Sequence, residues 1–448
     1  MKETKAQIHV SPQPSMFDEK VNISVEGLLP NRTYTIHSYT NVSKASAFEC
    51  FAHYRSNKHG VVSIKDDSSL GGSYRGVEPM GLFWAMDRSP DNTNPHARMA
   101  ERNASKPTIV DLHVYDLILH SLEEISRLRK QGILQKHAVS SKQVERRYLA
   151  EGVRKMSLTL EEDGIWASLF IPPGKGPFPG VIHLGGGRPG LVENQAALLS
   201  RYGFATMALA SFDKTPGKFT HYSDKGFGLD YFERALKVFT SNPDVDSACG
   251  VGVVSFSFTT AIGLSMAQHL DQVKCVIWIN GQTHATYCPL IFKEVTLPSI
   301  PPNFKKSKFS KEGFASARYA HNLCNDPLHE SIASSLIKFH LKPKVGYLFV
   351  TSLDDKASPS ELNVNRAETL LKEVNHPNYE ILRLPGAGHV IMAPYSPITI
   401  TLDQGNFNIK MVQGGEKVAH CRAQESAWHC QIEFLKANLD PCMEKAKL

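Results

Sequence analysis

The spacing of apolar residues changes near residue 150, and this change constrains the fold more than any other feature of the chain. Before it, short segments alternate apolar and polar residues and are separated by Pro, Gly and Asn turns, which is typical of strands that bury one face. The clearest of these segments are 7–10, 20–25, 33–39, 47–51, 71–74 and 107–114. Short strands at this spacing predict a β-sandwich. A polar stretch from Ser121 to Arg147 follows, and its composition predicts helix.

Beyond residue 150, apolar runs suited to buried parallel strands alternate with helical patterns. The expected strands are 181–184, 205–210, 251–255, 276–279 and 345–350, and the expected helices are 191–202, 229–240, 259–270, 360–374 and 418–438. This alternation predicts an α/β domain with a mainly parallel sheet. The 448 residues are therefore expected to form two domains, a β-sandwich over 1–150 and an α/β domain over 151–448.

Composition and charge exclude several classes of protein. With 42% hydrophobic residues and a net charge of +6, the chain is not of the disordered type. It holds no apolar run long enough to span a membrane and begins without a signal-peptide h-region, so we expect an intracellular protein. The only dense basic run is Lys305, Lys306, Lys308 and Lys311, and nucleic acid is not expected as a partner.

Two His-Cys pairs are the only candidate metal ligands. His420-Cys421 and His429-Cys430 lie nine residues apart in an expected helix, where about 100° per residue puts them on opposite faces. They cannot share one ion, so no metal site is expected.

A glycine loop after the first expected parallel strand allows three interpretations. Gly185, Gly187 and Gly190 match the G-x-G-x-x-G dinucleotide fingerprint, with Asp213 about twenty residues later. Alternatively, backbone N–H groups of the loop form half of an oxyanion hole, or the loop is a plain turn. Pro189 stands where a helix would have to begin under a pyrophosphate, which weighs against the first interpretation.

Ser257 occupies the turn between a buried strand and an apolar helix, where hydrolases of the nucleophile-elbow class carry G-x-S-x-G. Ser255 and Thr259 stand where that pattern has glycines, and Thr259 adds a branched side chain at a crowded position. An acid and a base follow in the required order. Asp355 ends a later buried strand, with Asp354 as the alternative, and His389 follows the next strand.

Several segments resemble the type I acyl-coenzyme A thioesterases and their relatives, the bile-acid-CoA:amino-acid N-acyltransferases. They are 176–182, 203–210, 229–235, 279–281, 384–389, 394–397 and 414–416. The resemblance covers nearly the whole chain and implies an α/β-hydrolase domain preceded by an immunoglobulin-like β-sandwich. It also implies Ser257 as nucleophile, Asp355 as acid and His389 as base, and no cofactor. The resemblance also implies an oxyanion hole formed by the N–H groups of Phe258 and Gly186. In that case the glycine loop does not bind a dinucleotide.

The resemblance leaves three functions open. A serine nucleophile is typical of the thioesterases, which hydrolyse fatty acyl-CoA, and the transferases carry cysteine. The segments 254–256 and 263–267 are closer to the transferases, which conjugate acyl groups to glycine or taurine. Thr259 motivates the third function, a catalytically impaired acyl-CoA binder. The lysine run is either a solvated loop or a contact for coenzyme A phosphates.

The tripeptide Ala446-Lys447-Leu448 resembles a terminal Ser-Lys-Leu peroxisomal signal. It predicts a peroxisomal location through an import receptor, with the cytosol as the alternative.

Overall fold

The structure is a computed structural model that describes residues 5–43, 46–94, 96, 98–99, 101–187, 189–212, 222–223, 226–321, 330–404 and 409–439. The chain divides into two compact units. The first consists of Met1–Tyr148 and Met392–Ile398, and the second of Leu149–Ile391 and Thr399–Leu448. The sequence predicted one boundary near residue 150 and gave no sign that a short segment after His389 belongs to the first unit.

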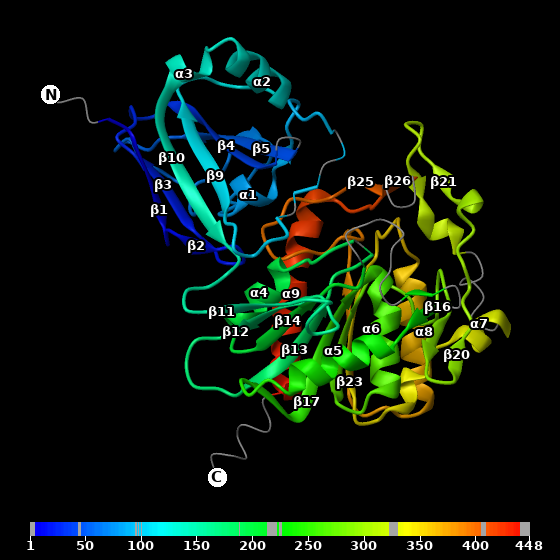
Figure 1. Ribbon diagram of the computed structural model, residues 1–448. Coiled ribbons are helices and arrows are strands. Elements are labelled where there is room, and N and C mark those ends of the chain that lie inside the picture. The colour runs from blue at the N-terminus through cyan, green and yellow to red at the C-terminus, as the bar shows by residue number, and fades with distance from the viewer. Residues whose placement is uncertain are drawn as a thin grey trace. The chain divides into compact units, whose positions relative to one another are not determined.

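The described residues of the first unit form a β-sandwich from two sheets (Figure 1). One sheet has the order β1 (Gln7–Ser11), β3 (Asn22–Glu26), β6 (Val62–Ser63). The other has the order β2 (Ser15–Met16), β10 (Ala138–Arg147), β9 (Thr108–Tyr115), β4 (Thr33–Ser43), β5 (Ser46–Arg55), β7 (Gly71–Gly72), with β8 (Asp87–Arg88) also paired to β5. The helices are α1 (Gly81–Trp84), α2 (Leu122–Lys130) and α3 (Leu134–His137). The period-two segments of the sequence therefore correspond to strands.

The helix predicted from Ser121 to Arg147 is wrong in its second half. Residues 138–147 form strand β10, which pairs antiparallel with β9 from Ala138 opposite Tyr115 to Arg146 opposite Thr108. Only Val144 and Arg146 of this strand are buried. Because the strand is mostly polar, it shows no alternation of apolar and polar residues. Its partner strand β9 lies about thirty residues earlier in the chain, so a local sequence pattern does not reveal the pairing.

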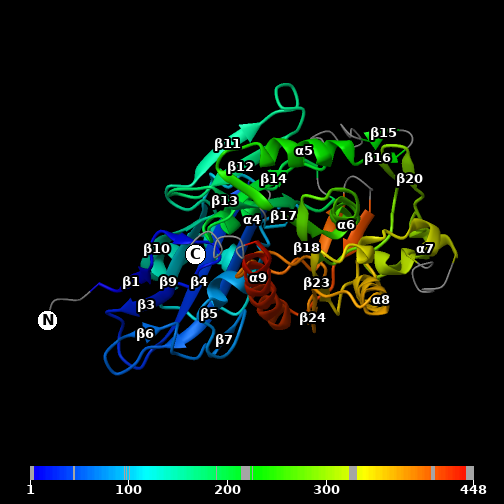
Figure 2. The same cartoon turned by 90° about the horizontal axis from the view of Figure 1, so that it is seen from below.

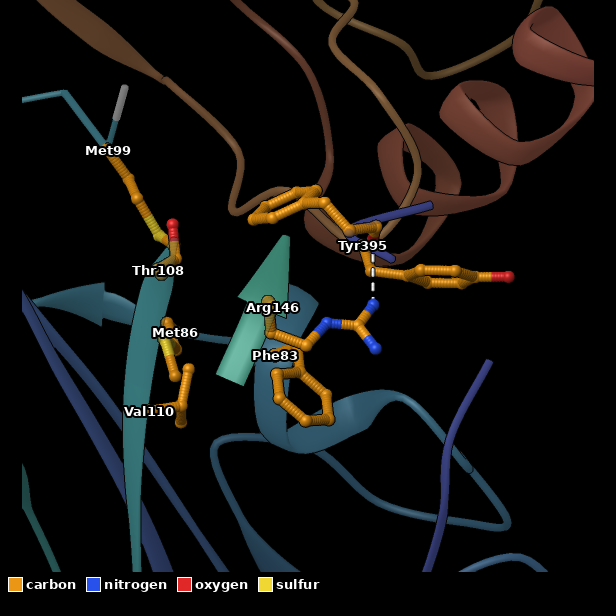
Figure 3. A pocket seen from close by; sticks show the side chains of 8 residues that line it. Phe83, Met86, Met99, Thr108, Val110, Arg146 and Tyr395 are labelled. Carbon is orange, nitrogen blue, oxygen red and sulfur yellow. Dashed lines mark hydrogen bonds between the residues drawn. The ribbon is translucent and has the colours of Figure 1, made fainter. Parts of the chain in front are cut away.

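A buried arginine anchors one end of the first unit (Figure 3). The Arg146 guanidinium donates hydrogen bonds to Ser15 Oγ (3.0 Å) and to the carbonyl oxygens of Phe17 (2.7 Å) and Glu19 (2.8 Å). Burial lowers the pKa of Arg146 to about 10. The guanidinium lies beside a small apolar pocket lined by Phe17, Phe83, Met86, Met99, Thr108, Val110, Arg146 and Tyr395. Tyr395 shows how the segment 392–398 is built into this unit.

The second unit is built on one large, mostly parallel sheet (Figure 1). In the described part of the chain its order is β11 (Arg154–Leu158), β12 (Ala167–Ile171), β14 (Ala205–Leu209), β13 (Phe178–Leu184), β17 (Val245–Phe256), β18 (Val273–Ile279), β23 (Gly346–Ser352), β24 (Tyr379–Leu384). Only the pairings of β11 with β12 and of β12 with β14 are antiparallel. This sheet, with a tight strand-to-helix turn after β17, is that of the α/β-hydrolase fold, as the sequence predicted.

Helices cover both faces of the sheet (Figure 2). They are α4 (Asn194–Ser200), α5 (Asp230–Thr240), α6 (Thr260–His269), α8 (Ser360–Glu373) and α9 (Lys417–Leu439), with α7 (Glu330–Ser335) beside them. On β17, Gly252 faces Leu435 of α9, whereas the next residue, Val253, faces Gly263 of α6. Since neighbouring strand residues point to opposite faces, α6 and α9 lie on opposite sides of the sheet.

Two small sheets complete the second unit. One joins β15 (Tyr222–Ser223), β16 (Gly226–Gly228), β19 (Leu290–Phe292) and β20 (Val295–Leu297), and the other joins β21 (Lys308–Phe309), β22 (Ala315–Ser316), β26 (Ile409–Val412) and β25 (Thr401–Gln404). Among the described helices of both units, none has the length and the apolar content needed to cross a membrane.

Candidate active site

Ser257 lies at the carboxyl end of β17, in a single 3-10 turn (Ser257–Thr259) that leads into α6. Its φ of 55° is in the left-handed region, which non-glycine residues seldom adopt and which is typical of strained functional turns. Ser255 replaces the first glycine of the usual motif without a clash. A Cβ on Gly263 of α6 would lie 2.8 Å from Ser255 Oγ, so the absence of a side chain at Gly263 leaves the room that Ser255 needs.

His389 joins Ser257 to Asp355 through two hydrogen bonds. Its Nδ1 lies 2.8 Å from Asp355 Oδ2, and its Nε2 lies 2.9 Å from Ser257 Oγ. An ionised carboxylate only accepts hydrogen bonds, so Nδ1 carries the proton and Nε2 is free to accept the hydroxyl proton of Ser257. The three side chains that the sequence singled out, 98 and 34 residues apart in the chain, thus form one hydrogen-bonded series.

Asp355 is fully engaged as an acceptor, which fixes its orientation. Its Oδ1 accepts from the backbone N–H groups of Ala357 and Ser358, both at 2.8 Å. Its Oδ2 accepts from the Ser360 hydroxyl at 2.5 Å as well as from His389. The alternative acid, Asp354, faces elsewhere. It forms an ion pair with Lys356 and accepts from the backbone N–H of Gly415 at 2.8 Å.

The loop that carries His389 is held by groups that the sequence did not single out for this role. The His389 N–H donates to the Gln413 carbonyl (2.8 Å), and its carbonyl accepts from Asn280 Nδ2 (2.7 Å). On either side, His420 Nδ1 accepts from the Gly388 N–H and His420 Nε2 donates to the Val390 carbonyl, each at 3.1 Å.

The sequence held a signal for two of these residues. Asn280 lies in the segment 279–281 that contributed to the family resemblance, and His420 drew attention as a candidate metal ligand. Both ring nitrogens of His420 are used by the loop, and burial lowers its pKa to about 4. Within the described residues, no group of three His, Cys, Asp or Glu side chains could hold a metal ion.

The glycine loop lies against the turn that carries Ser257. A Cβ on Gly186 would lie 2.7 Å from Phe256 Cδ1, and a Cβ on Gly187 would lie 3.3 Å from Phe258 Cβ. The loop therefore packs on both neighbours of Ser257. A side chain at position 186 would clash with the Phe256 ring, and position 187 is tightly packed against Phe258. Of the three interpretations of the loop, this position suits an oxyanion hole formed with the Phe258 N–H.

Aromatic side chains surround Phe258. Its ring centroid lies 5.0 Å from that of Phe212, 6.0 Å from Phe227 and 5.3 Å from Tyr287. His321 packs edge-on against Tyr287 and is 4% exposed. Its burial outweighs the attraction of the Asp355 carboxylate and lowers its pKa to about 4. Phe258, the residue after Ser257, thus packs among aromatic rings.

Comparison with known proteins gives the family. A family model described as the C-terminal part of BAAT and acyl-CoA thioester hydrolases matches residues 227–441, and one for their N-terminal region matches 18–160. Mouse (Mus musculus) acyl-coenzyme A thioesterase 5 is 34% identical over 95% of this chain and 94% of its own length. The chain belongs to this family. Its resemblance to thioesterases and N-acyltransferases, predicted from the sequence, is confirmed.

Both branches of the acyl-CoA thioester hydrolase family are represented among the relatives, and both consist of enzymes. Mouse bile acid-CoA:amino acid N-acyltransferase is 32% identical over 97% of this chain and 98% of its own length. Mouse peroxisomal succinyl-coenzyme A thioesterase is 32% identical over 96% of each chain. Similar identity to both branches means that overall likeness does not separate hydrolysis from amino-acid transfer.

The lysine run of this family member extends from a 3-10 turn (Phe304–Lys306) through β21 into the turn that follows it. Lys305, Lys306, Lys308 and Lys311 are all exposed, and Lys308 Nζ lies 4.1 Å from the centre of the Tyr319 ring. Exposure agrees with a solvated loop and leaves the contact with coenzyme A phosphates as a prediction. The tripeptide Ala446-Lys447-Leu448 lies outside the described residues.

Proposed function

We propose that this chain is an acyl-CoA thioesterase that releases a free fatty acid and coenzyme A through a covalent acyl-enzyme on Ser257. The observation that carries the proposal is the hydrogen-bonded series from Ser257 Oγ through His389 to Asp355, at 2.9 and 2.8 Å. It is the arrangement that activates a serine hydroxyl, in a family whose members act on acyl-CoA thioesters.

The first step forms the acyl-enzyme. His389 Nε2 takes the Ser257 proton as the hydroxyl oxygen attacks the thioester carbonyl, and Asp355 stabilises the imidazolium that results. The N–H groups of Phe258 and Gly186 bind the tetrahedral oxyanion, with each donor contributing about 3–4 kcal/mol in comparable sites. The C–S bond then breaks and coenzyme A leaves as a thiol, protonated by His389.

The second step releases the acyl group. His389 removes a proton from water, which attacks the ester carbonyl, and Ser257 leaves with the proton restored. In the alternative function the attacking group is the amine of glycine or taurine, and the product is an amide. A serine ester reacts less readily with amines than a cysteine thioester does, which favours water. The segments 254–256 and 263–267, which are closer to the transferases, favour the alternative.

One experiment separates the candidates. Fatty acyl-CoA and bile-acid-CoA are offered with and without glycine or taurine, thiol release is followed with a thiol reagent, and products are identified by mass spectrometry. A thioesterase releases thiol without an amine and yields free acid. A transferase needs the amine and yields an amide. Ser257→Ala should abolish either activity, whereas Ser200→Ala, which removes a buried hydroxyl in α4, should retain it. Loss of turnover in every arm would leave only a catalytically impaired acyl-CoA binder.

The nucleophile itself gives a second prediction. Ser257→Cys should raise the ratio of amide to free acid when glycine or taurine is present, because a thioester intermediate is more reactive toward amines. The ratio is measured by mass spectrometry at fixed acyl-CoA and amine concentrations. An unchanged ratio at measurable turnover would show that the acceptor is selected by the site and not by the intermediate.

We further propose a peroxisomal location through the tripeptide Ala446-Lys447-Leu448, read by an import receptor. A relative named as a peroxisomal thioesterase supports it. A fusion that leaves the tripeptide free should coincide with a peroxisomal marker and become cytosolic when the tripeptide is deleted. A cytosolic distribution of the intact fusion would contradict the proposal.

A further inference from the structure

Thr259 stands two residues after Ser257, where the elbow pattern carries glycine. Its backbone does not require glycine, because its φ of −77° and ψ of −4° are in the ordinary helical region. The strained residue is Ser257 itself. The branched side chain is completely buried, so its hydroxyl must find partners inside the protein.

The Thr259 hydroxyl connects the ends of two neighbouring strands. Its Oγ1 accepts from the Phe256 N–H at 3.1 Å, and its single proton is shared between the carbonyls of Phe256 (3.0 Å) and Leu184 (3.2 Å). Phe256 is the last residue of β17, and Leu184 is the last residue of β13. The hydroxyl thus links the Phe256 N–H to the Leu184 carbonyl, and this link is called the relay below. It follows the last paired residues of the two strands, Leu184 and Ser255.

This relay connects the two chain segments that carry the proposed oxyanion donors. Phe258 directly precedes Thr259 in the chain, and Gly186 follows Leu184 by two residues. Any change in the separation of these strand ends moves one donor relative to the other. We propose that Thr259 is a positioning residue that sets the distance between the Phe258 and Gly186 N–H groups, and is not a defect of the elbow. The inference rests on the proposed function, since it assigns a role within the same site.

Three substitutions at this position separate the hydroxyl from the shape of the side chain. Thr259→Val keeps the shape and removes the relay, and Thr259→Gly restores the usual elbow residue and also removes the relay. Both should lower kcat for acyl-CoA about 10- to 100-fold with KM changed less than about threefold, because misplaced donors weaken transition-state binding. Thr259→Ser keeps the hydroxyl and should retain kcat within about threefold.

The matched control is Thr206→Val on β14. Thr206 is also completely buried, and its Oγ1 donates to a single carbonyl, that of Ala196, at 2.8 Å. A purely structural role for Thr259 would give the two valine variants the same effect, namely a lower melting temperature with kcat preserved. A positioning role requires the loss of kcat at Thr259 alone.

The second measurement is the rate at which a fluorophosphonate probe labels the serine, which does not depend on the acyl-CoA chosen. Ser257 Oγ forms a bond to phosphorus, fluoride leaves, the hydroxyl proton passes to His389, and the phosphoryl oxygen occupies the oxyanion hole. Labelling should be absent in Ser257→Ala, slowed about 10- to 100-fold in the Val and Gly variants, and near wild type in Thr259→Ser and Thr206→Val.

The outcomes are distinct. Thr259→Gly with kcat or labelling equal to or above wild type would overturn the inference, as would a Val variant that retains its rate. A wild-type chain that is labelled but hydrolyses no acyl-CoA overturns the proposed function alone, and the labelling rates still test Thr259. A wild-type chain inert to both probe and acyl-CoA overturns the nucleophile and, with it, the role of Thr259.

Discussion

At the scale of single residues, the position of His389 depends on side chains that never touch the serine. His420 bonds to the backbone on both sides of His389, at the Gly388 N–H and the Val390 carbonyl. An imidazole can do this only in its neutral form with the proton on Nε2, since a protonated Nδ1 could not accept from Gly388. Burial keeps that form, because it lowers the pKa of His420 to about 4.

Replacing His420 should therefore affect both stability and turnover. His420→Ala leaves the Gly388 N–H and the Val390 carbonyl without partners, at a cost of about 1–3 kcal/mol each, and should lower kcat about tenfold by shifting His389. His420→Asn keeps an acceptor near the Nδ1 position and should lie between the alanine variant and wild type. Urea unfolding and acyl-CoA turnover measure the two effects.

The control for His420 is His429, which lies on the same helix and is exposed. His429→Ala should change the unfolding free energy by less than about 0.5 kcal/mol and leave turnover intact. A His420→Ala variant that matches this control would show that the loop holds His389 without the imidazole.

The sequence singled out the three hydrogen-bonded side chains of the candidate site more readily than the residues that hold them. Ser257 and Asp355 each follow a buried strand, which is visible as an apolar run followed by a polar residue. His389 follows the partly exposed strand β24, after a loop of small residues. The Ser360 hydroxyl holds Asp355 by donating to its carboxylate. The Asn280 side chain holds His389 by donating to its backbone carbonyl. Such partners have no fixed spacing from the groups they hold, so a pattern in the chain does not reveal them.

At the scale of elements, helices and strands with a clear apolar spacing were predicted correctly, and those with a weak spacing were not. The helix expected over 229–240 is α5, at Asp230–Thr240, because its buried apolar residues recur at helical spacing and pack on the sheet. Strand β10 was missed because only two of its side chains are buried. Strands of two to four residues, such as β21 and β25, carry too few residues to establish a period.

The elements of the first unit are joined by a buried charged cluster around Glu49 of β5. Its Oε2 lies 2.9 Å from His37 Nε2 of β4 and also pairs with Arg129 of α2, and its Oε1 accepts from Ser89 Oγ at 2.5 Å. Burial alone would raise the pKa of Glu49, but the hydrogen bonds from His37 and Ser89 and the Arg129 charge hold it below its ordinary value. The cluster thus fastens helix α2 to the sheet.

Breaking this cluster should destabilise the protein strongly. Glu49→Gln removes a completely buried charge and leaves the Arg129 guanidinium facing an amide, so the unfolding free energy should fall by about 3 kcal/mol. The control is Glu368→Gln on α8, whose pairs with Lys372 and Arg383 lie at the surface and should contribute less than about 1 kcal/mol. Urea unfolding of the full chain measures both, and equal effects would contradict a central role for Glu49.

At the scale of the whole molecule, the sequence predicts two domains but does not predict that a segment late in the chain belongs to the first unit. The change of period near residue 150 predicts a single boundary there, and the longer segment of the first unit ends at Tyr148. The segment Met392–Ile398 belongs to the first unit although it follows His389 by only three residues. Tyr395 beside Arg146 shows why, since this membership rests on packing between residues far apart in the chain.

The second unit also buries several neutral histidines, which makes its stability depend on pH. Burial is the main cause that lowers the pKa of His183, His321 and His420 to about 4, from an ordinary value of 6.5. Below about pH 6.5 the unfolded chain binds a proton at each imidazole, whereas the folded chain does so only near pH 4. Since the unfolded state binds more protons between these values, the unfolding free energy falls as the pH falls, by roughly 1–2 kcal/mol per histidine at about pH 5.

The melting temperature should therefore decrease steadily from about pH 7 to about pH 5. His183→Gln removes one of the titrating groups and should make this decrease shallower, and replacing the exposed His429 by Gln should leave its slope unchanged. A melting temperature that is constant or rises on acidification would show that these imidazoles gain partners for their protonated form in the folded chain. Acid would then tighten the second unit, and His420 could no longer be the neutral acceptor that Gly388 requires.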